Sequence, residues 1–229
     1  MQTLLLRWRF LALLVTLALL LVVSPVLQAA FDSRLVFDAL LSLVFVAAFA
    51  AVFTERSLRV PALLLGIPTL LGAWTGDVVP GLPRLPLAVG FHLVATAYLG
   101  LAIAAILRAV HREERVSADS VYGAFCGYLL LGLAFGHLYS LLEAVAPGSF
   151  RLRHDLATPV HDPERRQFLL TYFSLVTLTT VGYGDITPGS DPARGLAAVE
   201  AVLGQFYVAV LIAELIGKRV AQTLSGPRP

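Results

Sequence analysis

Long apolar runs separated by short polar segments dominate this chain of 229 residues. Six runs approach or exceed the length of about 20 residues that a bilayer-crossing helix needs. They cover residues 10–29, 35–53, 60–75, 86–108, 120–143 and 194–217. The third is the weakest, because it is short and contains Pro61 and Pro68, although neighbouring helices can satisfy the backbone groups that these prolines free. The pattern predicts an all-α integral membrane protein with about six transmembrane helices.

A further apolar stretch runs from Gln167 to Thr179, between the fifth and sixth of these runs. Its length of about 12 residues is too short to cross a bilayer. Non-spanning backbone is tolerated inside a membrane only where protein or a water-filled cavity surrounds it. We therefore expect a re-entrant helix here.

The composition agrees with a membrane protein. The chain is 58% hydrophobic and 14% charged, with a mean hydropathy of +0.81, whereas soluble domains are near half apolar and a quarter charged. The net charge of +2 is small and the arginines are scattered, so the sequence argues for membrane lipid and against nucleic acid as a partner. A lone Cys126 cannot form an intrachain disulfide, and we expect it to pack among apolar residues.

The N-terminal segment allows two interpretations. Arg7 and Arg9 precede the apolar run, as in a signal peptide, and Leu27-Gln28-Ala29 offers a possible cleavage site. The run continues almost unbroken to Phe31, which favours a retained first helix.

Basic residues suggest the orientation. With the N-terminus inside, the cytoplasmic segments hold Arg7, Arg9, Arg56, Arg59, Arg108, Arg112, Arg115, Lys218, Arg219 and Arg228. The short outer loops hold Arg34, Arg84 and Arg194, and the outer segment 144–167 adds four arginines, which weakens the contrast. We expect a multi-pass protein of the plasma membrane with both termini cytoplasmic.

The most distinctive segment is residues 179–185, which read Thr-Thr-Val-Gly-Tyr-Gly-Asp. Gly182 and Gly184 can take left-handed backbone angles at little cost, because they lack a Cβ. Alternating those angles with ordinary ones at the other residues can turn successive carbonyls toward one axis. A ring of such oxygens can replace the water around a dehydrated cation.

The motif resembles the selectivity filter of the potassium channel family through all five residues of Thr-Val-Gly-Tyr-Gly and the aspartate that follows. The resemblance implies that K⁺ is bound by Thr180, Val181, Gly182 and Tyr183. Thr180 would supply both its hydroxyl and its carbonyl at the inner end. Filter support would come from Thr179, Gly184, Asp185, Tyr172, Phe173 and Glu143.

The order of helix, outer loop, half-helix, filter and helix over residues 120–220 resembles the pore module of the same family. Each chain has one filter loop and a closed ring needs four, so a homotetramer is expected. The half-helix would aim the partial negative charge of its C-terminal end at the central cavity. No cofactor is expected beyond the permeant K⁺ ions.

The expected domains are a four-helix membrane domain (1–107), a cytoplasmic linker (108–119), the pore domain (120–220) and a short cytoplasmic tail (221–229). The fourth predicted helix contains no arginine or lysine between Pro86 and Leu107. Steep voltage gating needs several charges per subunit, so weak voltage dependence is predicted. His92 in this helix is read as a packed or hydrogen-bonded histidine, with a proton sensor as the alternative.

Several residues in the second half keep two interpretations. Glu143 either braces the loop outside the filter, as the resemblance implies, or is an interfacial carboxylate. Gly204 is either a gating hinge of the inner helix or a site of close helix packing. The inner helix would line the cavity with Gln205, Val208, Ile212, Ile216 and Val220, which have helical spacing and resemble the cavity-facing set of the family.

Other polar residues have a plain and a functional interpretation. Glu200 and Glu214 are carboxylates within an apolar helix and hence functional candidates, but Glu214 is four residues from Lys218 and can pair with it. His154, Asp155, His161 and Asp162 can bind a metal ion or simply belong to a solvated loop over the pore mouth.

These observations predict a potassium-selective channel that conducts passively. The alternative is a membrane sensor or ligand-binding module in residues 1–107, with the pore as its effector or a relic. An enzyme is disfavoured, because the sequence lacks a nucleophile elbow, metal-ligand spacing and a glycine-rich phosphate loop before a helix.

Overall fold

The computed structural model describes residues 9–31, 34–53, 55–74, 84–113, 116–153 and 163–224. Helices form nearly all of this part of the chain, and its strands are limited to one short antiparallel pair. The helices are α2 (Arg9–Ala18), α3 (Ser24–Phe31), α4 (Arg34–Val52), α5 (Arg59–Gly72), α7 (Arg84–Arg112), α8 (Ala118–Val145), α9 (Pro163–Leu178) and α10 (Asp191–Leu224). A short 3₁₀ turn, η2 (Arg56–Leu58), precedes α5. The strands are β1 (Phe150–Leu152) and β2 (Ile186–Pro188).

A π-helical segment, η1 (Leu19–Val23), joins α2 to α3. It ends immediately before Ser24 and Pro25. Proline has no backbone N–H to donate within a helix, and a wider turn before it relieves the clash with the preceding turn. The first predicted run therefore forms one continuous but locally widened helical segment.

A helix lies at each of the six predicted runs. Four helical segments are long and apolar enough to cross a membrane by length and composition: Arg9–Leu27, Leu85–Arg112, Ala118–Val145 and Asp191–Thr223. The apolar helices Val36–Val52 and Arg59–Gly72 are shorter. The chain is thus an all-helical, multi-pass membrane protein.

The helix ends differ from the predicted ones because polar residues extend the apolar runs. The half-helix α9 begins at Pro163 and not at residue 167, since proline suits the first turn of a helix. The Oγ of Ser190 accepts a hydrogen bond from the amide of Ala193 (3.3 Å), which starts α10 at Asp191 instead of 194.

Helices extend into the predicted linker 108–119 from both sides. α7 continues to Arg112, and α8 begins at Ala118 after a capping box formed by Ser117 and Ser120. Ser117 Oγ accepts from the Ser120 amide (3.1 Å), and Ser120 Oγ accepts from the Ser117 amide (2.8 Å).

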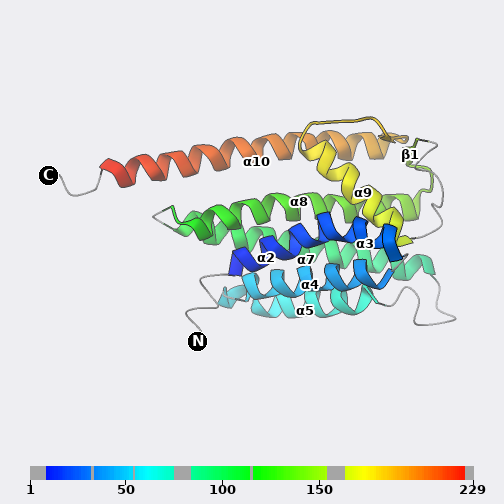
Figure 1. Cartoon of the computed structure of the whole chain (residues 1–229), viewed down its shortest axis with the longest axis horizontal. Helices are drawn as coiled ribbons and strands as arrows, with labels where there is room; N and C mark the ends of the chain where they lie inside the picture. The colour runs from blue at the N-terminus through cyan, green and yellow to red at the C-terminus, as the bar shows by residue number, and fades with distance from the viewer. Residues whose placement is uncertain are drawn as a thin grey trace.

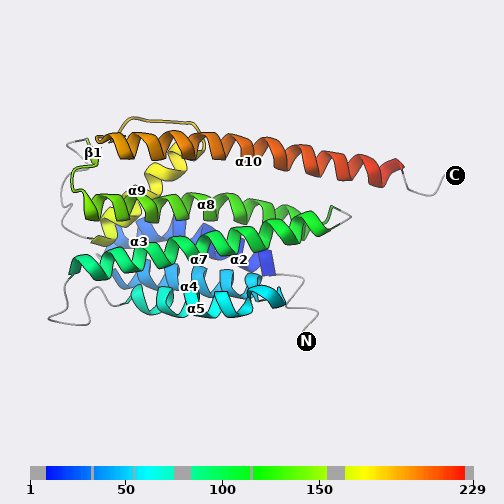
Figure 2. The ribbon, with the colours of Figure 1, turned by 180° about the vertical axis from the view of Figure 1, so that it is seen from behind.

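The helices form a bundle with α8 near its centre and α10 along one edge (Figure 1). α8 packs against α7, α2 and α9, while α9 crosses obliquely between α8 and α10. The reverse view shows α7 lying along α8, with α4 and α5 beyond it (Figure 2). One apolar cluster joins α2, α4, α5 and α7 to α8 through residues such as Leu13, Phe45, Ala62, Leu99 and Leu130. The first four predicted runs therefore share a core with α8.

Candidate functional site

The segment 179–185 begins by wrapping around the C-terminal end of α9. The last four carbonyls of a helix lack partners within it. Here each of them accepts a hydrogen bond: Leu175 O from the Thr179 amide (3.0 Å), Val176 O from the Val181 amide (3.0 Å), Thr177 O from the Thr180 amide (2.9 Å) and Leu178 O from the Tyr128 hydroxyl (3.0 Å). The end of α9 thus holds the start of this segment in place.

Left-handed backbone angles occur at alternate residues of the segment. The φ angles are +60° at Thr180, +57° at Gly182 and +74° at Gly184. The prediction of such angles at the two glycines is confirmed, but Thr180 was expected to have an ordinary angle, and this was wrong. A left-handed residue other than glycine costs free energy, so the surrounding structure has to hold it. The amide of Thr180, bonded to Thr177 O, supplies one such restraint.

Asp185 fixes the outer end of the segment. Its Oδ2 accepts a hydrogen bond from the Tyr172 hydroxyl on α9 (2.7 Å), and its Oδ1 accepts from the Ile186 amide (3.0 Å). Its carbonyl accepts from the Arg153 amide (2.9 Å) next to β1. β1 pairs with β2 directly after Asp185, with Leu152 opposite Ile186. The segment is therefore tied at both ends.

Glu143 braces the loop between α8 and β1. Its Oε1 accepts a hydrogen bond from the Gly148 amide (2.8 Å), and its Oε2 accepts from the Phe150 amide (3.1 Å). β1 pairs with β2, which directly follows Asp185. Glu143 is therefore connected to the segment 179–185 through the strand pair. The geometry favours the bracing interpretation over a merely interfacial carboxylate.

Small residues let α9 approach its two neighbouring helices closely. A Cβ added to Gly136 would lie 2.9 Å from the Cα of Thr171. A Cβ added to Gly204 of α10 would lie 2.6 Å from the carbonyl oxygen of Leu178. Gly204 therefore packs closely on the end of α9, and α10 is continuous through it, while its role as a gating hinge stays a prediction.

Phe173 packs away from the segment, in an apolar cluster beneath the strand pair. Its ring centroid lies 5.2 Å from that of Tyr139 and 5.4 Å from that of Phe150. Among the two predicted aromatic supports, Tyr172 bonds to the segment itself, while Phe173 holds α9 against α8 and β1.

The segment and the exposed face of α10 are both uncovered in the single chain. Tyr183 is 70% and Val181 52% exposed. Every member of the predicted cavity stripe is exposed: Gln205, Val208, Ile212, Ile216 and Val220. Further apolar side chains of α10 are exposed as well, among them Val199, Phe206 and Val210. α10 thus offers a long apolar surface to lipid or to another chain.

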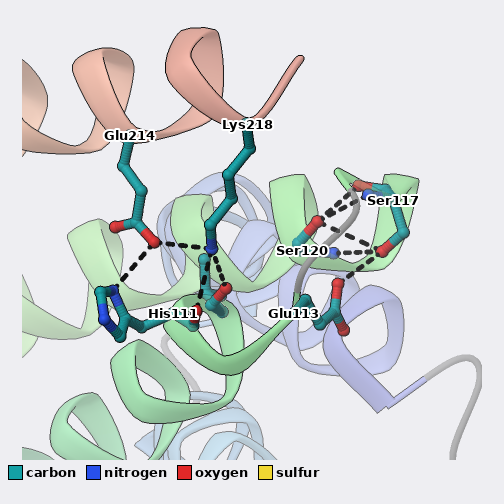
Figure 3. A network of polar contacts seen from close by, with 7 residues as sticks. His111, Glu113, Ser117, Ser120, Glu214 and Lys218 are labelled. Carbon is teal, nitrogen blue, oxygen red and sulfur yellow. Dashed lines mark hydrogen bonds and ion pairs between the residues drawn. The ribbon is translucent and has the colours of Figure 1, made fainter. Parts of the chain in front are cut away.

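The far end of α10 is held by a polar network (Figure 3). Glu214 pairs with Lys218 (2.7 Å), as the spacing predicted, and also contacts His111 Nδ1 (3.1 Å). Lys218 Nζ donates to the carbonyls of Val110 (2.9 Å) and His111 (3.0 Å) at the end of α7. α10 is therefore connected to α7 at a point far from the segment 179–185.

Two other expectations concern buried side chains. His92 is hydrogen-bonded: its Nδ1 lies 3.1 Å from Nδ1 of the fully buried His137. Cys126 is buried, and its thiol donates to the carbonyl of Phe10 (3.3 Å), which agrees with the expected packing role.

The four candidate metal ligands between residues 154 and 162 lie outside the described residues.

The contacts that α8 makes with α9 and α10 were not predicted from the sequence. Gly132 and Gly136, which meet α9, are spaced four residues apart, and Gly127, which meets Tyr207 of α10, follows Gly123 at the same spacing. This spacing of small residues is typical of close packing between membrane helices and is the signal that predicts them. The Tyr207 hydroxyl, which donates to Ala124 O (2.8 Å), and the partners of Glu200 have no comparable local signal.

Comparison with known proteins bears on this site directly. A family model described as an ion channel matches residues 160–220, which include α9, the segment 179–185 and most of α10. Protein LctB of Bacillus caldotenax is 30% identical over 131 residues, which are 52% of this chain and 93% of that protein.

Two potassium channels of a plant are also similar to the chain. Two pore potassium channel c of Oryza sativa subsp. japonica is 32% identical over 89 residues, covering 39% of this chain and 16% of the plant protein. Two pore potassium channel a of the same plant is 41% identical over 44 residues, covering 19% of this chain and 13% of the plant protein. No solved structure matches the chain. This chain belongs to the potassium channel family. The similarity confirms the resemblance seen in the sequence.

Proposed function

We propose that the protein is a potassium-selective channel that conducts K⁺ passively through a filter made by residues 180–184. The observation that carries the proposal is the alternation of left-handed angles at Thr180, Gly182 and Gly184. Angles that alternate in this way turn successive carbonyls toward one side of the chain. Rings of such carbonyls from several chains replace the hydration shell of K⁺. Thr180, Val181, Gly182 and Tyr183 supply them, with the Thr180 hydroxyl at the inner end.

The proposed channel is a homotetramer with four-fold symmetry. A single chain contributes one filter strand, and a closed ring around an ion needs several copies about an axis. The exposure of Tyr183 and of the apolar face of α10 supports this assembly. In the tetramer, the stripe from Gln205 to Ile216 lines the cavity below the filter.

In the membrane, six helical segments cross the bilayer and α9 is re-entrant, with both termini in the cytoplasm. The Arg112–Glu55 pair (2.8 Å) and the Lys218 contacts with α7 bring basic residues of α7 and α10 together at one end of the bundle. Basic residues favour the cytoplasmic side, so the strand pair and Asp185 face outward. Because α7 carries its basic side chains only at its ends, voltage dependence is weak.

Potassium flux from liposomes that contain the purified full-length chain tests the proposal. We expect K⁺ to leave the vesicles far faster than Na⁺ under equal gradients, and barium serves as an added control. Native mass spectrometry of the same sample should give the mass of four chains. Equal flux of sodium and potassium, or a monomer in lipid, would contradict the proposal.

A further inference from the structure

Glu200 is a fully buried carboxyl group in the middle of the proposed pore module. It is the tenth residue of α10, and its side chain is 0% exposed. At a rise of about 1.5 Å per residue it lies about 14 Å along the helix from Asp191. This is close to the centre of a hydrocarbon layer about 30 Å thick. An ionised carboxylate at such a position is costly unless it is paired.

The partners of Glu200 are two hydroxyl groups from different helices. Its Oε2 is hydrogen-bonded to the Tyr139 hydroxyl of α8, and its Oε1 to the Ser174 hydroxyl of α9. Ser174 Oγ also lies 2.7 Å from the carbonyl oxygen of Gly132 in α8. Glu200, Ser174 and Gly132 thus form a chain of hydrogen bonds across three helices.

The number of protons that these hydrogen bonds require determines whether Glu200 is protonated or ionised. A serine hydroxyl has one proton to donate, and a carbonyl oxygen can only accept. If Glu200 were ionised, Ser174 would have to donate to both Gly132 O and Glu200 Oε1, and one of these contacts would lack a proton. If Glu200 is protonated, it donates to Ser174 Oγ, Ser174 donates to Gly132 O, and Tyr139 donates to Glu200 Oε2. Only the protonated form satisfies all three contacts.

We propose that Glu200 is an uncharged carboxylic acid that acts as a positioning residue for the filter. It joins α9 to α8 and α10 through Ser174, two residues before Val176. The carbonyl of Val176 accepts from the Val181 amide (3.0 Å) inside the filter segment. The acid therefore holds the helix end on which the filter is built. Its role in selectivity rests on the proposed function, whereas its protonation does not.

Infrared difference spectroscopy of the purified full-length protein tests the protonation. The wild type minus Glu200→Gln spectrum should show the C=O stretch of a protonated, buried carboxyl group. The matched control is Glu214→Gln on the same helix, which should remove only a carboxylate band, because Glu214 pairs with the Lys218 ammonium. If Glu200→Gln removes only a carboxylate band, the proposal is overturned.

Flux measurements test the positioning role separately. Glutamine mimics the neutral acid, since its NH₂ donates to Ser174 and its carbonyl accepts from Tyr139. Glu200→Gln should keep the wild-type ratio of K⁺ to Na⁺ flux. Glu200→Leu removes the acceptor of the buried Tyr139 hydroxyl and the link from α10 to Ser174, and should lower that ratio by about tenfold. A glutamine variant as impaired as the leucine variant, or an unimpaired leucine variant, would refute the positioning role. A wild type that does not select K⁺ would refute the proposed function, while the infrared result would still decide the protonation.

Discussion

The Tyr172 hydroxyl donates a hydrogen bond to Oδ2 of Asp185 across 2.7 Å. The bond joins two residues 13 positions apart, because Tyr172 lies on α9 before the filter and Asp185 lies directly after it. The helix that starts the filter segment therefore also fixes its end. A segment tied in this way keeps its carbonyl spacing when an ion leaves, which is what discrimination between K⁺ and Na⁺ requires in the proposed channel.

Removal of this hydroxyl should loosen the outer end of the filter. In Tyr172→Phe, Asp185 loses a hydrogen-bond donor, and a hydrogen bond to a charged group contributes about 1.5–3 kcal/mol. We expect a lower ratio of K⁺ to Na⁺ flux in liposomes. Tyr98→Phe is the matched control, because it removes a hydroxyl that bonds Phe45 O (2.8 Å) far from the filter. Equal effects of the two substitutions would argue against a role for the Tyr172 bond in selectivity.

Gly182→Ala should abolish selective current. Alanine at a φ of +57° costs about 1–2 kcal/mol in backbone free energy, and a shift of this residue displaces the carbonyls next to it. Gly100→Ala is the control, since Gly100 is in helix α7 and a Cβ there meets open space. The measurement is K⁺ and Na⁺ flux for both variants. A fully selective Gly182→Ala channel would refute the carbonyl-ring account.

Gly204→Ala distinguishes close packing from a hinge. The new Cβ would lie 2.6 Å from Leu178 O, and overpacking of this kind costs about 1–3 kcal/mol. We expect a lower thermal unfolding temperature of the detergent-solubilised protein. Gly217→Ala in the same helix has open space and should be neutral or stabilising by up to about 1 kcal/mol. If Gly204→Ala proved as stable as Gly217→Ala and changed only channel opening, the hinge interpretation would be favoured.

Glu143→Ala should destabilise the loop before β1. The substitution leaves the amides of Gly148 and Phe150 without an acceptor, at a cost of about 1–3 kcal/mol. We expect a lower unfolding temperature and faster hydrogen exchange in β1 and β2. Asp191→Ala, which removes a carboxylate 94% exposed in its side chain, should have a much smaller effect. Indistinguishable exchange in the two variants would contradict the brace.

Lys218→Met should release the far end of α10 from α7. The ammonium pairs with Glu214 and donates to two carbonyls of α7, so its loss removes three contacts at once. We expect faster hydrogen exchange over the last turns of α10. Arg219→Met is the control, because Arg219 is the exposed neighbour with the same charge. No difference between the two variants would show that the network in Figure 3 does not hold this helix.

Much of the proposed pore could be predicted because its signals are local. Length and apolarity mark the membrane helices, and the glycines at 182 and 184 mark the left-handed positions. The spacing of Glu214 and Lys218 predicted their pair in the same way. Helix ends were less predictable, since hydropathy does not register the Ser190 cap or the helical Pro163.

The sequence by itself determined that the chain enters a membrane and carries a potassium channel filter motif, because both depend on neighbouring residues along the chain. Only the tertiary structure decided that Gly204 packs on Leu178, that His92 meets His137, and that Glu200 is bonded to Tyr139 and Ser174. These contacts join residues that are 26 to 61 positions apart along the chain, so no local pattern predicts them. Burial removes the water that would otherwise satisfy such groups, so their partners depend on how the helices pack.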